Sequence, residues 1–196
     1  MNRQILTISS ILFLFYVKSA AQINKSDKIF LSKQIQKFIP KGYAILDKSI
    51  GDLNLDKFKD IILVLKDTAE KDEIDTIEFK RPLLILIGHA DKSFTLAGRN
   101  DDVVYCVGCG GIFGDPYDGI TIYKGTFTIN HFGGSNDRWS NEITFKYSAT
   151  NKTWYLFKVV EKGWNVGNLN KIDSTIKTKK DFGVISFEKY NPDSSE

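Results

Sequence analysis

The residues best suited to chemistry lie in one short acidic segment, GDLNLDKFKD at positions 51–60. Counted from Asp52, side chains that carry oxygen stand at the first, third, fifth and ninth positions, which are Asp52, Asn54, Asp56 and Asp60. Phe58 stands at the seventh position and would supply its backbone carbonyl oxygen. Calcium takes six to eight oxygen ligands at about 2.3–2.6 Å, and a tight loop can point alternate residues at one centre. The segment therefore predicts a calcium loop, with a structural role because an oxygen cage leaves no open position for catalysis.

Two residues separate this segment from an EF-hand. Lys57 stands at the sixth position, where a glycine makes the sharp turn, and Leu63 stands at the twelfth in place of a bidentate glutamate. The alternative is a polar turn whose Asp and Asn side chains bond to their own backbone, and both interpretations stay open. The pattern resembles the D-x-[DN]-x-D-x-x-x-D calcium loop of FG-GAP or VCBS-type repeats. One copy implies a loop between two strands and does not imply a propeller.

Cys106 and Cys109 are the only cysteines, and they lie in the glycine-rich stretch CVGCGGIFGDP. In an exported protein the first expectation for two cysteines is a disulfide, here a local bridge that pins a turn. Free thiols, a redox pair and a zinc site completed by His89 and His131 are the alternatives. A redox pair needs a helix after the first cysteine to lower its pKa, whereas glycines follow here.

The segment from His131 to Trp139 has the sequence HFGGSNDRW. It mixes a histidine, an arginine and aromatic rings. We expect it to link two strands. One interpretation is a binding loop for a sugar or a peptide, with Trp139 as a platform and Arg138 and Asp137 as polar contacts. Its alternative is a plain hairpin turn whose tryptophan packs on the core.

Catalytic motifs are scarce. The chain has two histidines and neither a G-x-S-x-G nor an H-E-x-x-H motif. We therefore favour a non-enzymatic binding domain, with His131, Arg138, Trp139 and Asp115 as ligand-binding candidates. One alternative is a cell-envelope hydrolase with its site around His131. Another is an inhibitor or immunity protein for an envelope-targeted toxin, which would use the glycine-rich stretch after Cys109 as a protruding loop.

Residues 1–21 have the pattern of a cleaved signal peptide: Arg3, an apolar run from Ile5 to Val17, and small residues before a cut at Gln22. This predicts a secreted or periplasmic protein whose partner is an unknown protein or glycan of the cell envelope. The leader carries two of the net three positive charges, which leaves about +1 in the mature chain. A nearly neutral chain does not predict binding to nucleic acid, and no second stretch is apolar enough to span a membrane.

The elements that would position these residues begin with a predicted helix that carries Leu31, Ile35, Phe38 and Ile39 on one face. Strands follow, and the continuous apolar runs at 61–65 and 83–87 predict strands buried on both faces. Further strands are expected at 43–50, 94–100, 103–106, 121–131, 139–148, 153–161 and 184–190. The fold class that follows is α+β, an N-terminal helix packed on a mainly antiparallel sheet, in a single domain over 22–190 with a polar tail at 191–196.

Four segments in this order resemble an uncharacterised family of secreted bacterial proteins: GDLNLDKFKDIILVL, RPLLILI, CVGCGGIFGDP and HFGGSNDRWSNEITFKY. The resemblance covers about residues 50–160. It implies export and a single domain, and it carries no established activity.

Overall fold

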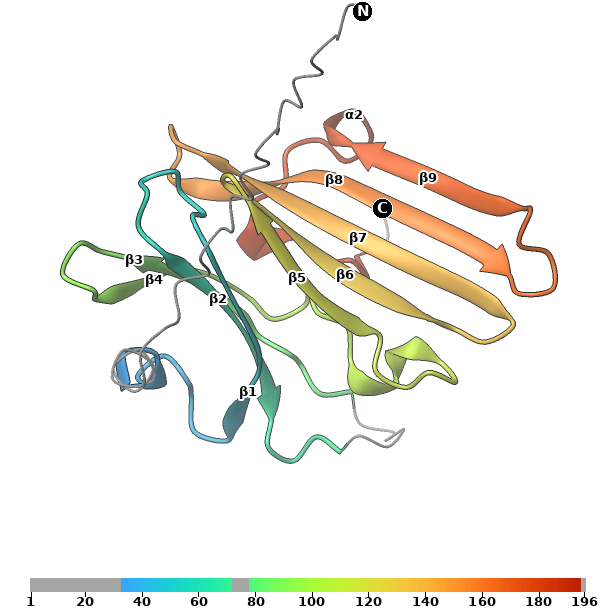
Figure 1. The fold of residues 1–196 in the computed structure, drawn as a ribbon, viewed down its shortest axis with the longest axis horizontal. Coiled ribbons are helices and arrows are strands. Elements are labelled where there is room, and N and C mark those ends of the chain that lie inside the picture. The colour runs from blue at the N-terminus through green and yellow to red at the C-terminus, as the bar shows by residue number, and fades with distance from the viewer. Residues whose placement is uncertain (1–32, 72–77, 195–196) are drawn as a thin grey trace, which may run out of the picture.

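The computed structural model describes residues 33–71 and 78–194. Two antiparallel sheets, each a simple meander in chain order, make up most of this part (Figure 1). The strands of the four-stranded sheet are β1 (Tyr43–Gly51), β2 (Asp60–Asp67), β3 (Leu83–Gly88) and β4 (Phe94–Asn100). The strands of the five-stranded sheet are β5 (Tyr117–Tyr123), β6 (Thr126–Gly134), β7 (Asp137–Ser148), β8 (Thr153–Asn165) and β9 (Ile172–Thr178).

The main core lies between the two sheets. Each sheet contributes alternate residues to it, because successive side chains of a strand point to opposite faces. We call the face of the five-stranded sheet that lines this core its inner face, and the opposite one its outer face. The fully buried members of the core include Ile62, Val64, Leu83, Ile85, Phe127, Ile129, Ile143, Phe145 and Trp154.

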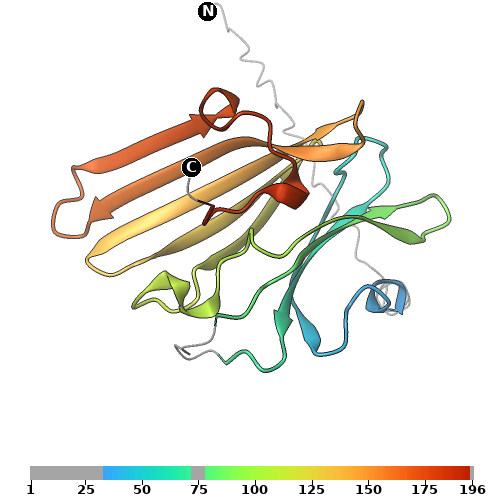
Figure 2. The same cartoon turned by 180° about the vertical axis from the view of Figure 1, so that it is seen from behind.

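The end of the chain completes this core. A short 3₁₀ turn, η2 (Phe187–Lys189), lies between β4 and the five-stranded sheet (Figure 2). Its Phe187 is fully buried, with its ring edge-on to Phe127 and Phe145 at 5.6 and 5.3 Å between centroids. The side-chain amide of Asn100 donates hydrogen bonds to the carbonyls of Phe187 and Tyr190, so the last strand of the first sheet holds the C-terminal segment in place.

A second apolar cluster covers the other face of the four-stranded sheet. Ile61, Leu63 and Leu65 of β2 point into it, while their neighbours Ile62 and Val64 point into the main core. The prediction that the apolar run at 61–65 forms a strand buried on both faces is therefore confirmed, as it is for β3. Ile35, with Phe38 and Ile39, packs on this cluster from the N-terminal side.

The predicted α+β class is wrong, because the described chain is mainly β. Near its start, only residues 33–36 are helical, and Leu31 and the predicted signal peptide lie outside the described residues. The other helical pieces are α2 (Lys179–Phe182) and the 3₁₀ turns η1 (Val107–Gly110) and η2. A second sheet, rather than a long helix, buries the main face of the first sheet. The helical spacing around Ile35 produces one short turn ahead of Pro40.

Several predicted strands are also corrected. The segment 121–131 contains a hairpin instead of one strand, because Lys124 and Gly125 both adopt positive φ (44° and 75°) and turn the chain between β5 and β6. Residues 103–106 are irregular, and 184–190 form one isolated bridge and η2. The strand β9 was missed because its polar and exposed sequence, IDSTIKT, shows no apolar alternation.

Candidate functional site

The segment 131–139 is a tight hairpin between β6 and β7, as the plainer of the two sequence interpretations expects. His131 pairs with Asn141, and Gly133 pairs with Trp139. Strand alternation places His131 and Trp139 on the inner face, whereas Arg138 lies on the outer face. A side chain at Gly133 would collide with the Trp139 ring at 2.6 Å, so this glycine provides the space that the indole occupies. Arg138 and Trp139 therefore cannot contact one ligand from the same side.

His131 is enclosed rather than exposed to a ligand, with 1% of its surface accessible. Tyr105 stacks on its ring at 4.1 Å between centroids, and the Tyr105 backbone N–H donates to Nε2 at 3.3 Å. Nδ1 has no hydrogen-bond partner among the described residues. Burial lowers the pKa of His131 to about 4; the carboxylate of Asp115 opposes this shift and the Arg81 cation adds to it. The ring is therefore neutral at ordinary pH.

Asp115, the fourth predicted ligand residue, belongs to an ion network around Arg81. Both Arg81 terminal nitrogens reach the Asp115 carboxylate, at 2.6 and 2.8 Å, and the same guanidinium bonds Glu70 at 2.6 Å. Arg81 and Glu70 are almost completely buried, with side-chain exposures of 1% and 0%, whereas Asp115 is 36% exposed. Nothing in the sequence singled out Arg81 or Glu70. The structure thus assigns Asp115 a positioning role, in which it anchors the glycine-rich segment to the first sheet.

Arg138 meets aromatic rings on the outer face. Its guanidinium lies 5.1 Å from the centre of the Phe113 ring, and Phe113 contacts Phe132, which in turn contacts Trp164. The segment after Cys109 is tied to β6 by a hydrogen bond from the Ile112 N–H to the Gly134 carbonyl. At its tip Ile112 is 78% exposed and Phe113 is 45% exposed.

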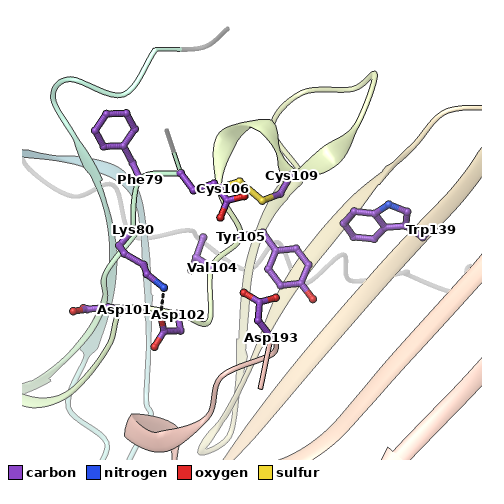
Figure 3. A pocket seen from close by; sticks show the side chains of 11 residues that line it. Phe79, Lys80, Asp101, Asp102, Val104, Tyr105, Cys106, Cys109, Trp139 and Asp193 are labelled. Carbon is purple, nitrogen blue, oxygen red and sulfur yellow. Dashed lines mark hydrogen bonds and ion pairs between the residues drawn. A yellow bond between two sulfur atoms is a disulfide. The ribbon is translucent and has the colours of Figure 1, made fainter. Parts of the chain in front are cut away.

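A cleft opens beside the inner face, where four distant parts of the chain converge (Figure 3). Its volume is about 340 Å³, which falls in the usual range of small-ligand sites. Of the four predicted ligand-binding residues, Trp139 alone is among the described residues that line it. The other lining residues are Glu78, Phe79, Lys80, Asp101, Asp102, Val104, Tyr105, Cys106, Cys109 and Asp193. His131 lies behind Tyr105 and does not reach the cleft.

The cleft combines aromatic walls with excess negative charge. Lys80, the one cation among the described lining residues, forms an ion pair with Asp102, and Asp101 is paired with Arg99 just outside. The side-chain carboxylates of Glu78 and Asp193 have no hydrogen bond or ion pair with any residue in the described part of the chain, so they remain available to a ligand. The lining residues alone carry four carboxylates against one amine.

Tyr105 supplies a positioned hydroxyl in this cleft. The Asn141 side-chain amide donates to the Tyr105 hydroxyl oxygen at 2.8 Å. Burial raises the pKa of Tyr105, so the hydroxyl keeps its proton at neutral pH. Its ring is fixed between His131 on one face and Trp139, whose centroid is 6.0 Å away. The buried histidine thus acts as a support for the Tyr105 ring that lines the cleft.

Cys106 and Cys109 form the predicted disulfide, which borders the cleft. The Glu78 carboxylate lies within 4.8 Å of both sulfurs, but sulfurs joined to each other are not thiolate ligands. The bridge closes the η1 turn immediately after Tyr105.

Loss of this disulfide should have a modest effect. We expect the Cys106→Ser/Cys109→Ser variant to lose about 2 kcal/mol of unfolding free energy, because so short a loop removes little chain entropy from the unfolded state. Urea unfolding of the variant and of the wild type in reductant should give the same midpoint. Complete alkylation of both cysteines in untreated protein would contradict the bridge.

The acidic segment forms the turn between β1 and β2. Both oxygens of Asp52 accept backbone hydrogen bonds, from Leu55 at 2.7 Å and Lys57 at 3.2 Å. Both oxygens of Asp56 also have partners, the Phe58 N–H and the Asn54 amide. Leu55 and Lys57 adopt positive φ. These contacts are those of the polar-turn alternative, and calcium binding stays a prediction from the sequence.

Asp60 differs from the other acids of the loop because it is fully buried. Its two oxygens accept the N–H groups of Leu53 at 2.7 Å and Gly88 at 2.9 Å, which fastens the turn to the end of β3. Burial raises the pKa of this carboxyl, against the lowering effect of the two hydrogen bonds. Asp60 is therefore a structural residue of the turn.

Comparison with known proteins finds no relative of this chain. No family model, no curated protein and no solved structure matches the chain. The resemblances to FG-GAP or VCBS-type loops and to a secreted bacterial family remain predictions. In the described ranges, 33–71 and 78–194, no helix has the length and apolar character needed to cross a bilayer.

Proposed function

We propose that this protein is an exported, non-enzymatic binding domain whose cleft takes the cationic side chain of a basic peptide or protein segment. The observation that carries the proposal is the composition of the cleft. Three aromatic side chains, Phe79, Tyr105 and Trp139, share it with four carboxylates. A guanidinium or ammonium group is attracted both by the face of an aromatic ring and by unpaired carboxylates.

The environment of Trp139 and Asp193 supports this chemistry. Trp139 comes from β7 and Asp193 from the C-terminal segment, so the two line the cleft from different elements (Figure 3). The Tyr105 hydroxyl accepts from Asn141 and retains a proton that it can donate to a peptide carbonyl. A neutral sugar would use the rings but not the excess of carboxylates, which is why we favour a cationic ligand.

The buried state of His131 explains why we propose binding rather than hydrolysis. A general base must reach the proton that it removes, and here Tyr105 stands between the His131 ring and the cleft. Export is supported by the N-terminal leader pattern and by the local disulfide, since disulfides persist in oxidising compartments. The natural partner would then be an envelope or extracellular protein that presents Lys or Arg.

The first test uses a hexaarginine peptide and isothermal titration calorimetry. We expect the mature protein, residues 22–196, to bind this probe with an affinity that falls as salt rises. Trp139→Ala and Asp193→Asn should each weaken binding about tenfold, because a cation–π contact or a charged hydrogen bond contributes about 1–2 kcal/mol.

Trp164→Ala is the matched control, because Trp164 lies on the opposite face of the same sheet and packs on Phe132. It should leave the affinity unchanged. The proposal fails if hexaarginine binds Trp139→Ala and Asp193→Asn as tightly as the wild type. It also fails if a neutral trisaccharide binds the cleft with an affinity that Asp193→Asn does not alter.

A further inference from the structure

The strand β9 forms a free and regular edge of the five-stranded sheet. Its seven residues pair continuously with β8 without a register shift, whereas four other strand pairs contain a bulge or irregularity. Figures 1 and 2 show no described segment alongside the edge of β9 that points away from β8. At the opposite edge of this sheet, β5 lies against β1, where the Ser49 hydroxyl donates to the Ile120 carbonyl.

Natural sheets protect a free edge with proline, bulges, outward charge or a short strand. β9 contains no proline, and its one lysine, Lys177, extends over the inner face to Glu161 of β8 at 3.3 Å. On the outer face Ile172 and Ile176 are both more than half exposed. Such an edge can accept an added strand through its backbone groups.

The sequence of β9 is complementary to itself when it is read antiparallel. In a two-fold pairing centred on Thr175, Asp173 of one chain stands opposite Lys177 of the other, and the reverse pair forms on the far side of the axis. Strand alternation places both residues on the inner face. Directly opposed residues of opposite charge stabilise an antiparallel pair, and like charges destabilise it.

We propose that two copies of this protein associate through β9, which joins their five-stranded sheets into one continuous antiparallel sheet. Lys177 then lies between its own Glu161 and Asp173 of the second copy. The Asp173 carboxylate has no hydrogen bond or ion pair with any residue of the described chain, so the second copy supplies the missing partner of this side chain. Thr178, the Ncap of α2, ends the pairing strand, since its capping box starts that helix.

A contact of seven residues per chain is smaller than a standard interface of about 1,600 Å². We therefore expect a reversible dimer with a dissociation constant on the order of 100 µM. Sedimentation velocity of the mature protein from about 10 µM to 1 mM should show the sedimentation coefficient rising with concentration.

Charge reversal provides the test. Asp173→Lys and Lys177→Glu should each lower self-association at least tenfold, because each variant places two like-charged pairs across the axis. An equimolar mixture of the two variants should dimerise again, since every opposed pair then carries opposite charges. Melting temperatures of the separate variants establish that each is folded.

Thr175→Lys tests the axis itself and leaves Asp173 and Lys177 in place. It brings two lysines together at the centre of the pairing and should also abolish dimerisation. The proposal is overturned if the wild type stays monomeric at 1 mM. It is equally overturned if Asp173→Lys and Thr175→Lys associate as the wild type does, which would place the contact elsewhere.

Discussion

Replacing Arg81 with methionine should lower the free energy of unfolding by about 3–5 kcal/mol, the largest effect that we expect from a single substitution. The guanidinium is 1% exposed and is hydrogen-bonded to Glu70, which is fully buried, and to Asp115. Burial by itself lowers the pKa of Arg81, but the hydrogen bonds to the two carboxylates reverse this and raise it, so the group stays charged. Without Arg81, Glu70 would be a buried charge with no counterion. Urea unfolding at pH 7 measures the loss.

Arg99→Met is the matched control. Arg99 also pairs with an aspartate, Asp101 at 2.7 Å, but both side chains are largely exposed, so its loss should cost under about 1 kcal/mol. A Glu70→Leu/Arg81→Met double variant should recover much of the stability, because both buried charges are gone and Asp115 is partly exposed to water. Equal effects of Arg81→Met and Arg99→Met would show that the network around Arg81 is not buried as described.

Acidification should destabilise the protein through His131, by about 3 kcal/mol between pH 6.5 and pH 4. The folded protein holds the His131 pKa at about 4 because burial disfavours the imidazolium, whereas the unfolded chain has the ordinary value of 6.5. Below pH 6.5 the unfolded state therefore binds a proton that the folded state cannot. Stability from this residue is fully present above pH 6.5 and is lost as the pH falls toward 4. Chemical unfolding at several pH values measures the dependence.

Carboxylates also titrate in this range. The contribution of His131 is therefore the difference between the loss of unfolding free energy in the wild type and the loss in His131→Gln. The glutamine variant should lose about 3 kcal/mol less than the wild type over the same interval. His89→Gln is the control, because His89 is exposed and, among the described residues, its ring is hydrogen-bonded only to the Thr95 hydroxyl. It should follow the wild-type curve. If the unfolding free energies of His131→Gln and the wild type changed with pH in parallel, the result would contradict a buried, neutral His131 ring.

Local patterns in the sequence predict individual strands well. The apolar runs that begin at Ile61 and Leu83 are typical of strands with cover on both faces, and the structure has both strands. The segment 94–100 and the hairpin through 149–152 are also placed correctly. The overall class was missed because nothing local shows which element covers a sheet. The helical spacing around Ile35 predicts a longer helix than the single turn at 33–36, while the polar strand β9 has no apolar alternation to predict it.

The cleft could be predicted only in part. Trp139 and the disulfide beside the cleft were singled out, and the pairing of Cys106 with Cys109 is confirmed. Tyr105 and Asp193 were not identified, since they are 88 positions apart and meet only through the packing of the C-terminal segment on β4. Adjacent residues can also mislead, because Arg138 and Trp139 are neighbours in the chain but lie on opposite faces of one sheet.

The burial of Phe187 has a consequence for the order of folding. Each sheet is a meander of chain neighbours, so its hairpins can form early from contacts close in sequence. The core between the sheets differs, because its central aromatic ring, Phe187, follows the strands of both sheets in the chain and contacts Phe127 and Phe145. A chain still in synthesis lacks this ring, and its two sheets cannot close over a filled core. Completion of this core is therefore a late step, which follows the synthesis of both sheets.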